Sequence, residues 1–378
     1  MKNDNQSYDR YQRQIILKEF GEAGQQKLLN AKVLVIGAGG LGCPALQYLA
    51  AAGVGTIGIV DDDVVSITNL HRQVLYSTFD VGFSKAEKAR HSLTRLNPDI
   101  NINAFQERLT TQNALDIINP YDIVIDGTDN FSSRYMINDA CVLLHKPLVY
   151  GAVSQFEGQV AVFNYQDKSG NISVNYRHLF PEPPGDGEIL NCAEAGVLGV
   201  LPGIIGTMQA NETIKLITGI GKPLINSLLT YNTLTNQVYE ISLSPSNETN
   251  ALIPRDKAAF EQMDYDWLCA SSTGRQFEID TAAFDQLRSA NNVDIIDVRE
   301  AGELPLPTEF KYLQIPLSQF RENIAVVKSK TVIVFCQSGK RSMQAAQLLF
   351  DTFGETKKIY SLHGGITNWL KSHPTQQT

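Results

Sequence analysis

The amino-acid sequence predicts an α/β fold twice over: a large unit with a doubly wound sheet and an antiparallel extension, then a small α/β unit. Short apolar runs at 32–37, 56–61, 121–126 and 147–153 alternate with helix-like stretches. Strands that alternate with helices imply a parallel sheet covered on both faces. A second set of the same kind begins near Phe277.

The elements of the large unit follow in order. Three helix-like stretches separate the apolar runs: Leu41–Ala52, Ser84–Leu96 and Phe131–Leu144. Residues 158–165 and 228–243 then alternate between apolar and polar, which is typical of antiparallel strands. Between these two segments we expect a Pro/Gly-rich loop over Pro181–Gly187 and a long helix from about Gly199 to Thr218.

The chain therefore divides into three parts. Residues 1–245 form the large unit, residues 246–275 show no sustained period and are predicted as a linker, and residues 276–378 form the small unit. The small unit contains the runs VDIIDVRE and KTVIVFCQSGKRS, a helix over Met343–Phe353, and KIYSLHGGITNW.

Composition excludes several classes of protein. A net charge of −8 disfavours a nucleic-acid binder, which usually carries a basic surplus. No apolar run approaches the roughly 18–20 residues of a membrane span, and the polar N-terminus lacks a signal-peptide core. Five scattered cysteines do not form a disulfide framework, so a reducing compartment, the cytoplasm, is expected.

A glycine-rich loop follows the first predicted strand. Its glycines are Gly37, Gly39, Gly40 and Gly42, and they fit the pattern G-x-G-x-x-G between a strand and a helix. Such a loop lets the backbone approach phosphate, and Asp61 ends the next strand at the spacing of an acid that bonds a ribose hydroxyl. The loop alone favours a nicotinamide or flavin cofactor in a Rossmann-like sheet.

Further charged and polar residues favour a triphosphate instead. After Asp61 come Asp62, Asp63, Asn69, Arg72, Gln73 and Lys85. A triphosphate needs cations against its terminal oxygens and an acid for magnesium. Asp129 and Asn130 follow another strand, at the sheet edge where ligands bind. The set predicts a site for ATP and Mg²⁺.

The motifs YQRQIIL at 11–17, GAGGLG at 37–42, D-x-D-x-V-x-x-x-N-L-x-R-Q across 61–73, and GTDN at 127–130 occur in order. Together with Lys85 they resemble the MoeB/ThiF enzymes, bacterial relatives of the ubiquitin-activating enzymes, over roughly residues 8–243. The resemblance implies adenylation of the C-terminal glycine of a small ubiquitin-like sulfur-carrier protein that ends in Gly-Gly. It also implies a homodimer.

The same resemblance implies roles for single residues. Asp61 would hold the ribose and Asp129 the magnesium, whereas Asn69, Arg72 and Lys85 would contact phosphates. Arg13 would be contributed to the ATP site of the neighbouring subunit. These roles agree with the chemistry, because attack of a carboxylate on the α-phosphorus concentrates negative charge that cations and magnesium must offset.

One feature of the family is missing from the sequence. Two C-x-x-C pairs usually bind a structural zinc, and the first should fall at 175–178, where this chain has Asn-Tyr-Arg-His. No cysteine occurs near 245–256 for the second pair. A closed zinc site needs four ligands, and only His178 could serve. We therefore expect no zinc, and a crossover loop held by packing alone.

The cysteines differ in their surroundings. Cys192 lies between the Pro/Gly-rich loop and a helix, where the family resemblance places a cysteine that takes part in a covalent step in some relatives. A small buried residue that merely packs is the equally weighted alternative for Cys192. Cys43 and Cys141 lie on helix patterns and are expected in the core, and Cys269 lies in the predicted linker without a catalytic role.

Cys336 begins the segment CQSGKRS, between a predicted strand and a predicted helix. The loop places a thiol among backbone N–H groups at a helix start beside Lys340 and Arg341, and these features stabilise a thiolate or persulfide. With IDVRE at 296–300 and HGGITNW at 363–369, the segment resembles a rhodanese domain over about 276–373. Asp297 and Arg299 would support the loop, and residues 303–312 depart from the usual pattern.

The two resemblances combine into one predicted reaction. The first unit makes an acyl-adenylate, a persulfide on Cys336 attacks it, and an acyl-disulfide is resolved by Cys192 or an external reductant to give a thiocarboxylate. A cysteine desulfurase is a candidate sulfur donor. Molybdopterin synthesis is favoured over thiamine synthesis and tRNA thiolation. The alternative from another class, an NAD-dependent oxidoreductase, explains the glycine loop and Asp61 but not Arg72, Lys85 or Cys336.

Overall fold

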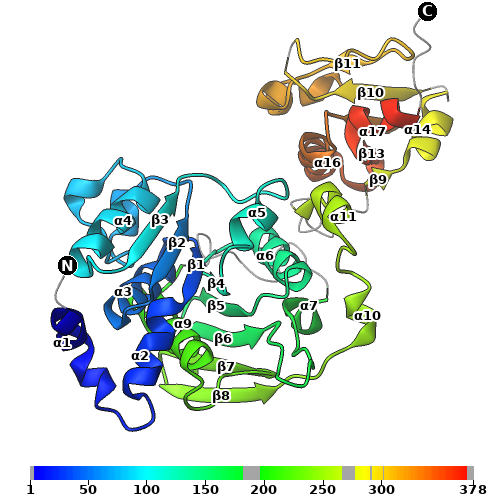
Figure 1. The fold of residues 1–378 in the computed structure, drawn as a ribbon. Coiled ribbons are helices and arrows are strands. Elements are labelled where there is room, and N and C mark those ends of the chain that lie inside the picture. The colour runs from blue at the N-terminus through cyan, green and yellow to red at the C-terminus, as the bar shows by residue number, and fades with distance from the viewer. Residues whose placement is uncertain (1–3, 182–195, 266–276, 290–291, 301, 373–378) are drawn as a thin grey trace, which may run out of the picture. The chain divides into compact units, whose positions relative to one another are not determined.

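The chain folds into two compact units, drawn in Figure 1. The computed structural model describes residues 4–181, 196–265, 277–289, 292–300 and 302–372. The first unit holds the described residues up to Tyr265, and the second holds those from Phe277 on. Each unit contains one sheet with helices, so the prediction of an α/β fold in both parts of the chain is confirmed.

The first unit is built on an eight-stranded sheet in the order β3-β2-β1-β4-β5-β6-β7-β8. Its strands are β1 (Lys32–Ile36), β2 (Thr56–Val60), β3 (Asn101–Phe105), β4 (Ile123–Asp126), β5 (Leu148–Ser154), β6 (Glu157–Phe163), β7 (Ser227–Asn232) and β8 (Gln237–Ser242). The strands from β3 to β5 run parallel, and β6, β7 and β8 add antiparallel pairs. The predicted doubly wound sheet and its antiparallel extension are both present.

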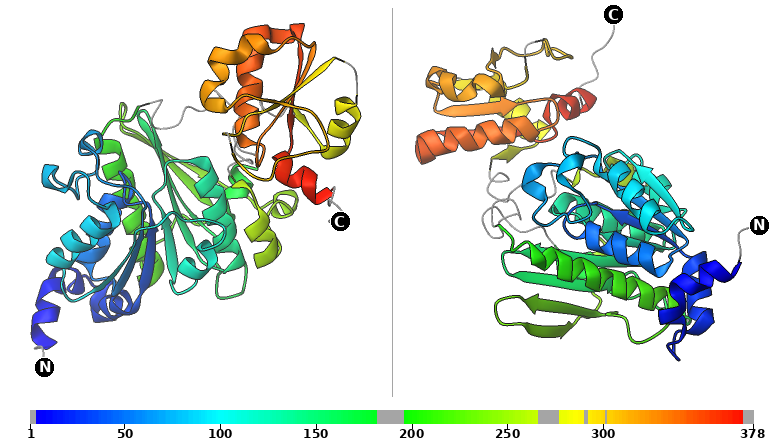
Figure 2. Two further views of the ribbon diagram at one scale, coloured as in Figure 1. Left: turned by 90° about the horizontal axis from the view of Figure 1, so that it is seen from above. Right: turned by 90° about the vertical axis from the view of Figure 1, so that its left-hand side faces the viewer.

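Helices cover both faces of this sheet (Figures 1 and 2). The described helices of the first unit are α1 (Asp4–Ile15), α2 (Gly21–Asn30), α3 (Gly42–Ala52), α4 (Lys85–Leu96), α5 (Ala114–Ile118), α6 (Phe131–Leu143), α7 (Tyr176–Leu179), α9 (Val200–Thr218), α10 (Asn247–Asn250) and α11 (Lys257–Gln262). Short 3-10 turns span Ile67–Asn69 and Thr78–Asp80.

The central strand β1 shows why the sheet is buried on both sides. Val33 and Val35 pack with the helices of one face, whereas Leu34 and Ile36 pack with α5 and α6 on the other. Successive side chains of a strand point to opposite faces, so a continuous apolar run fits only a strand covered twice. This burial leaves the carboxyl ends of the strands as the place for polar loops.

The segment predicted as a linker begins with ordered structure. It contains α10 and α11, and Phe260 and Tyr265 are buried in the core of the first unit. The Tyr265 hydroxyl donates to Oδ2 of Asp139 at 2.9 Å, and Asp139 also forms a buried bidentate ion pair with Arg177. Residues 246–265 therefore belong to the first unit.

The second unit has a five-stranded parallel sheet in the order β11-β10-β12-β13-β9. Its strands are β9 (Glu278–Ile279), β10 (Val293–Asp297), β11 (Leu313–Gln314), β12 (Thr331–Phe335) and β13 (Lys358–Leu362). Its helices are α14 (Thr281–Arg288), α15 (Phe320–Asn323), α16 (Lys340–Phe353) and α17 (Gly365–Ser372), with 3-10 turns at Leu317–Gln319, Ile324–Val326 and Gly354–Thr356. β12 packs Val332 and Val334 toward α16, and Ile333 and Phe335 toward Trp369 of α17.

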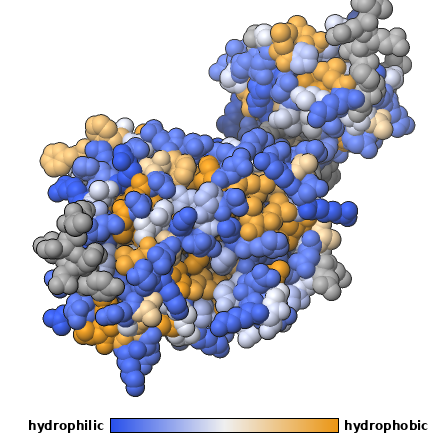
Figure 3. Space-filling model, viewed as in Figure 1, coloured by the Kyte–Doolittle hydropathy of each residue, from blue (hydrophilic) through white to orange (hydrophobic). Residues whose placement is uncertain are grey.

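The surface carries apolar areas between hydrophilic ones (Figure 3). Around the 3-10 turns of the first unit, six large apolar side chains are exposed: Val64, Ile67, Val74, Phe79, Val81 and Phe83. Phe79 is 91% exposed. Large apolar side chains exposed in this number over one segment of the chain, from Val64 to Phe83, are typical of an interaction surface. Among the described residues, no helix is both long and apolar enough to cross a bilayer.

Candidate functional site

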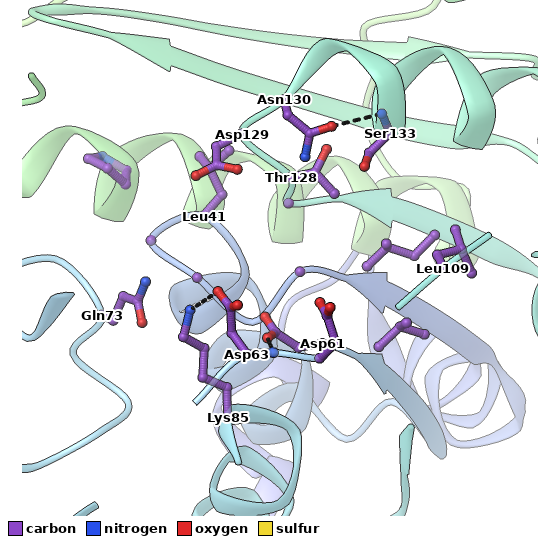
Figure 4. A pocket seen from close by; sticks show the side chains of 18 of the residues that line it. Leu41, Asp61, Asp63, Gln73, Lys85, Leu109, Thr128, Asp129, Asn130 and Ser133 are labelled. Carbon is purple, nitrogen blue, oxygen red and sulfur yellow. Dashed lines mark hydrogen bonds and ion pairs between the residues drawn. The ribbon is translucent and has the colours of Figure 1, made fainter. Parts of the chain in front are cut away.

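A cavity of about 350 Å³ opens at the carboxyl edge of the parallel strands in the first unit. The loops that follow β1, β2, β3 and β4 all contribute residues to its lining. Since parallel strands end at the same edge of a sheet, segments far apart in the sequence meet there. In Figure 4, Asp129 and Asn130 lie on one side of the cavity, and Asp63 and Lys85 lie on the other.

Most residues that the sequence assigns to the nucleotide site line this cavity. They are Gly37, Gly39, Gly40, Asp61, Asp63, Arg72, Gln73, Lys85, Asp129 and Asn130. Gly42, Asn69 and Arg13 are not among the described residues that line it. The structure thus brings together ten of the thirteen assigned residues. Of the other three, Arg13 lies in α1, Gly42 begins α3 and Asn69 ends a 3-10 turn.

The glycines of the loop after β1 have two roles: some allow close packing of the backbone, and one leaves the backbone open to the cavity. A Cβ atom at Gly42 would lie 1.9 Å from the Gly37 oxygen, so Gly42 lets α3 begin against the strand that precedes it. Gly37 has a φ of +91°, which favours glycine. At Gly39 a Cβ atom would meet only the side chain of Gln73, at 3.6 Å. Gly39 is therefore where the backbone lies open to a phosphate at the N-terminus of α3.

Asp61 connects the glycine loop to the end of β2. Its Oδ2 accepts from the Ala38 N–H at 2.8 Å, and its Oδ1 accepts from the Asp63 N–H at 2.9 Å. Burial raises the pKa of this carboxyl, and the nearby Lys85 ammonium opposes that rise. Two backbone donors hold the carboxylate in one orientation at the rim, where a hydroxyl of a ligand can reach it.

Lys85 is the cation of this wall. Its side chain is almost fully buried, and its Nζ lies 2.8 Å from Oδ2 of Asp63. The Asp63 side chain is 70% exposed, so the partner of the buried ammonium lies at the cavity mouth. A ligand phosphate can replace this carboxylate without leaving the ammonium unpaired.

The opposite wall follows β4. Asp126 is buried, and its Oδ1 accepts from the Thr128 N–H and hydroxyl at 2.9 and 2.7 Å, which fixes the turn before Asp129. Burial raises the pKa of the Asp126 carboxyl. Asn130 caps α6, because its Oδ1 accepts from the Ser133 N–H at 2.9 Å. Asp129 is thus presented between a braced turn and a helix start.

The 3-10 turn at Ile67–Asn69 presents the remaining polar wall. The Asn69 carbonyl accepts from the N–H groups of Arg72 and Gln73, both at 3.0 Å, so Asn69 shapes the turn rather than the cavity surface. Gln73 is 4% exposed, and its Oε1 is buried without a hydrogen-bond partner. This oxygen leaves a hydrogen-bond acceptor at the cavity wall that a polar group of a ligand or a water molecule can fill.

Sequence reasoning missed part of the lining. Arg134 lies one helical turn after Asn130, and its Nη2 donates to the Thr128 carbonyl at 3.2 Å. Glu107 and Arg108 come from the loop after β3, a strand that was not predicted. The i, i+4 spacing from Asn130 could have indicated Arg134, whereas Glu107 and Arg108 carried no motif.

A second candidate site lies in the other unit, at the end of β12. The Cys336 sulfur accepts from the Gly339 N–H at 3.1 Å, and Gly339 adopts a φ of +95° to begin α16. The predicted strand–loop–helix setting of this thiol is therefore present. Cys336 is only 1% exposed, so the loop encloses its sulfur closely.

Asp297 and Arg299 brace this loop, as the sequence predicts. Their side chains form a fully buried ion pair, with Nη2 of Arg299 2.7 Å from Oδ2 of Asp297. Nη1 of Arg299 donates to Oε1 of Gln337 in the cysteine loop at 3.1 Å and to the Pro305 carbonyl at 2.9 Å. One guanidinium thus connects β10, the loop after it and the cysteine loop.

Arg341 has a partner that the sequence did not reveal. Both terminal nitrogens of its guanidinium bond the Glu303 carboxylate, with Nη2 to Oε2 at 2.7 Å. Arg341 lowers the pKa of Glu303 to about 2 through this pair. The prediction placed the Arg341 charge beside the sulfur, and the structure pairs that charge with Glu303 of the 303–312 loop.

The other cysteines divide as follows. Cys43 and Cys141 are fully buried, as predicted, and burial raises the pKa of Cys43 to about 12 and that of Cys141 as well. Neither is a nucleophile at neutral pH. Cys192 and Cys269 lie outside the described residues.

Hydrogen bonds occupy the place where the family resemblance puts zinc. Nδ1 of His178 accepts from the Asn175 N–H at 2.8 Å, and Nε2 lies 3.1 Å from the Ser246 carbonyl. The neutral ring therefore carries its proton on Nε2 and joins α7 to the segment before α10. Within the described part of the chain, no group of three or more His, Cys, Asp or Glu residues could hold a metal.

This arrangement predicts a pH effect on stability. Burial lowers the pKa of His178, so its stabilising effect is complete above the ordinary histidine pKa, roughly 6.5. It is lost as the pH falls through that value and then through the lower folded pKa, because the unfolded chain binds the proton first. The free energy of unfolding should fall less steeply between neutral and mildly acidic pH in His178→Gln than in the native chain.

Denaturant titrations at several pH values measure this difference. His145→Gln is a matched control, since His145 is also a histidine of the first unit but lies outside the contact with Ser246. Parallel pH profiles for native protein and His178→Gln would contradict the prediction.

Comparison with family models identifies both parts of the chain. Residues 11–252 match the ThiF family, and residues 280–372 match the rhodanese-like domain. A "Probable adenylyltransferase/sulfurtransferase MoeZ" of Mycobacterium tuberculosis is 41% identical over 96% of this chain and 92% of the relative. A "Sulfur carrier protein adenylyltransferase" of Thermus thermophilus is 48% identical over 71% of this chain and 99% of the relative.

A third relative and a solved structure extend the comparison. A "Probable molybdopterin-synthase adenylyltransferase" of Porphyra purpurea is 37% identical over 96% of this chain and 93% of its own length. The crystal structure of E. coli MccB with ATP is 21% identical, with a TM-score of 0.53 over 65% of this chain and 74% of that one. At this identity the likeness of the solved structure concerns the fold alone.

Proposed function

Because this chain belongs to the ThiF family and carries a rhodanese-like domain after it, we propose that it adenylates a sulfur-carrier protein and then delivers sulfur to it. The substrate is the C-terminal glycine of a small ubiquitin-like protein that ends in Gly-Gly. The observation that carries the proposal is that one chain holds both a polar nucleotide cavity and an enclosed thiol.

The cavity geometry supports roles for its residues. The Gly39 backbone and the N-terminus of α3 face the phosphates, and Asp61 accepts from a ribose hydroxyl. Lys85 leaves Asp63 and pairs with phosphate oxygens, and Arg72 adds a second cation. The carrier carboxylate attacks the α-phosphorus, the bond to the bridging oxygen breaks, and pyrophosphate leaves with the electron pair.

One carboxylate of the cavity wall, that of Asp129, suits a magnesium ion, which is usually held by one or two carboxylates together with phosphates and water. Asp129 is proposed as its ligand, since hard cations prefer carboxylate oxygens and the turn before it is braced by Asp126. Bound magnesium would neutralise charge that develops on the phosphates. The protein itself contributes a fixed backbone on both sides of Asp129, because Thr128 bonds Asp126 before it and Asn130 caps α6 after it.

The second unit supplies the sulfur. A persulfide on Cys336 attacks the carbonyl carbon of the adenylate with its outer sulfur, and AMP leaves with the electron pair. A thiol then attacks Sγ of Cys336 in the resulting acyl-disulfide, and the thiocarboxylate leaves as a new disulfide forms. Cys192 or an external thiol is the resolving group, and a cysteine desulfurase in a reducing cytoplasm is the proposed source of the persulfide.

The test uses purified chain, ATP, magnesium, a persulfide donor and several carriers that end in Gly-Gly. Mass spectrometry of each carrier distinguishes the carboxylate from the heavier thiocarboxylate. The molybdopterin-synthase carrier is expected to react best, in line with the name of the Porphyra relative, and carriers of thiamine synthesis and tRNA thiolation are the alternatives. Absence of both adenylation and thiocarboxylate with every carrier would refute the proposal.

We propose further that the enzyme is a homodimer whose Arg13 enters the neighbouring nucleotide site. Arg13 is exposed in the last turn of α1 and does not line the cavity of its own chain. The exposed apolar side chains from Val64 to Phe83 flank residues of that cavity in the sequence. Burial of this cluster between two copies would bring a partner close to the nucleotide loops.

Zinc is not part of the proposed function. Since Asn175 and His178 take the place of one cysteine pair and the other pair is missing, elemental analysis should find no stoichiometric zinc. About one zinc per chain, as a closed structural site holds, would contradict this prediction. Chelators should leave the unfolding temperature unchanged, because the His178 bonds need no metal.

A further inference from the structure

Two buried hydroxyls lie behind Cys336 in the second unit. Ser342 belongs to the first turn of α16, and Ser361 belongs to β13, the strand beside β12. Both residues are 0% exposed. The Ser361 Oγ lies 2.9 Å from the Ser342 Oγ, which in turn lies 3.6 Å from the Cys336 sulfur. A strand far along the chain is thus connected to the thiol through one intermediate side chain.

The hydrogens on this chain of hydroxyls can be assigned. Each serine has one hydrogen to donate, and Ser361 donates its own to Ser342. Ser342 can then direct its hydrogen either to the Gly339 carbonyl, at 3.0 Å, or to the Cys336 sulfur. A negative charge on the sulfur favours the second choice, because hydrogen bonds to charged acceptors are stronger than those to neutral ones.

Two charged side chains near the loop are already paired with carboxylates, so neutral donors become relevant to the charge on the sulfur. Arg341 is paired with Glu303, and Arg299 is paired with Asp297. Each of these two guanidinium groups is therefore offset by a carboxylate, so hydrogen bonds from neutral donors have a part in stabilising the sulfur anion. The Gly339 N–H supplies one of these, and Ser342 can supply another.

We propose that Ser361 is a positioning residue for sulfur transfer, acting through Ser342 on the charge of Cys336. Accepting a bond from Ser361 polarises the Ser342 hydroxyl and makes it a better donor. The inference rests on the proposed function, in which Cys336 carries the sulfur. With thiosulfate, the Cys336 thiolate attacks the sulfane sulfur, the sulfur–sulfur bond breaks, and sulfite leaves with the electron pair. The persulfide anion that remains needs the same donors.

The experiment compares Ser361→Ala with the native full-length chain in two measurements. The first is the ultraviolet absorbance of the Cys336 thiolate against pH, taken as the difference from the same protein with Cys336→Ser. The second is the rate of sulfur transfer from thiosulfate to cyanide. The midpoint of the absorbance titration should rise by about 0.5–1 pH unit, and transfer below that midpoint should fall about three- to tenfold.

Control variants separate this role from simple packing. Ser329→Ala removes a hydroxyl that bonds Asp294 at the opposite end of β12, and it should change neither measurement. Ser361→Thr and Ser361→Val have similar volumes, and only the threonine keeps the hydroxyl. The threonine variant should titrate like the native protein and the valine variant like Ser361→Ala, which keeps the test decisive if the alanine variant does not fold.

Ser342→Ala provides the last comparison. Because Ser361 acts through Ser342, the double variant should titrate like Ser342→Ala alone. An unchanged titration midpoint in Ser361→Ala would overturn the inference, even if its transfer rate fell. Absence of sulfur transfer by the native chain would instead count against the proposed function, while the thiolate titration would still decide the role of Ser361.

Discussion

Asp129→Ala is expected to abolish carrier-dependent exchange of pyrophosphate into ATP while the protein remains folded. Asp129 lies across the cavity from Asp63 and Lys85 (Figure 4), and it is the carboxylate proposed for magnesium. Without the Asp129 carboxylate, the proposed magnesium ion loses its protein ligand. The negative charge of the phosphates then lies close to the remaining carboxylates of the cavity with less compensation. Loss of a preorganised electrostatic group in a transition state commonly costs on the order of 10²–10³ in rate.

The control for this variant lies at the other end of the same strand. Asp122 precedes β4, and its Oδ2 accepts from the Lys32 N–H at 2.8 Å. Asp122→Asn keeps an acceptor there and should exchange pyrophosphate at nearly the native rate. Thermal unfolding of Asp129→Ala should match that of native protein, since Asp126 and Thr128 hold the turn. Near-native exchange by Asp129→Ala at physiological magnesium would refute the assignment.

Much of the lining of the candidate site was predictable because parallel strands place their ends together. The glycine loop, Asp61 and Asp129 each follow or end an apolar run, so sequence order indicated a common edge, whereas the phosphate contact of Lys85 was assigned through the family resemblance. Glu107 and Arg108 escaped prediction because β3, an edge strand, is only partly buried and lacks a continuous apolar run. Burial on both faces gives a sequence signal that an edge strand does not give.

The predicted linker shows another limit of sequence patterns. Phe260 and Tyr265 are buried, although the residues around them have no helical or strand period. Tyr265 bonds Asp139, which is paired with Arg177, and both of these residues are far from Tyr265 along the chain. Contacts between separate segments leave no local period, so only the folded structure reveals them.

The ion pair between Arg341 and Glu303 escaped prediction for the same reason, because its two members belong to separate segments of the chain. The basic residue after the cysteine was visible in the sequence, but its partner lies in a loop that departs from the rhodanese pattern. The charge near Cys336 therefore could not be read from the cysteine loop alone. What the sequence did indicate is the setting that follows from backbone geometry: a thiol after a strand, facing a helix start.

Cys336→Ser should separate the two reactions of the enzyme. The substitution replaces a sulfur by an oxygen in a loop that otherwise keeps its bonds, and an alcohol cannot carry a sulfane sulfur. Asp61, Lys85 and Asp129 belong to the other unit and are untouched. The variant should adenylate the carrier at close to the native rate, yet it should accept no sulfur from thiosulfate or a persulfide donor and make no thiocarboxylate.

Cys192→Ser is the matched cysteine variant, and it should affect a later step than Cys336→Ser does. Sulfur should still load on Cys336, and only transfer or release should slow if Cys192 resolves the acyl-disulfide. Cys141→Ser is unsuitable as a control, because Cys141 is fully buried in the core and a hydroxyl there would lack water. The two informative variants thus differ in which step they stop rather than in how strongly they disturb the fold.

The decisive measurement is the mass of the carrier after incubation with ATP, a sulfur donor and each variant. Native enzyme should convert the carboxylate to the thiocarboxylate, whereas Cys336→Ser should leave the carrier as adenylate or as hydrolysed carboxylate. Added free sulfide should restore thiocarboxylate formation by Cys336→Ser, since an activated acyl group reacts with any accessible sulfur nucleophile. If Cys336→Ser makes thiocarboxylate from the persulfide donor as fast as native enzyme, the rhodanese-like domain is not the sulfur source, and sulfur reaches the adenylate by another route.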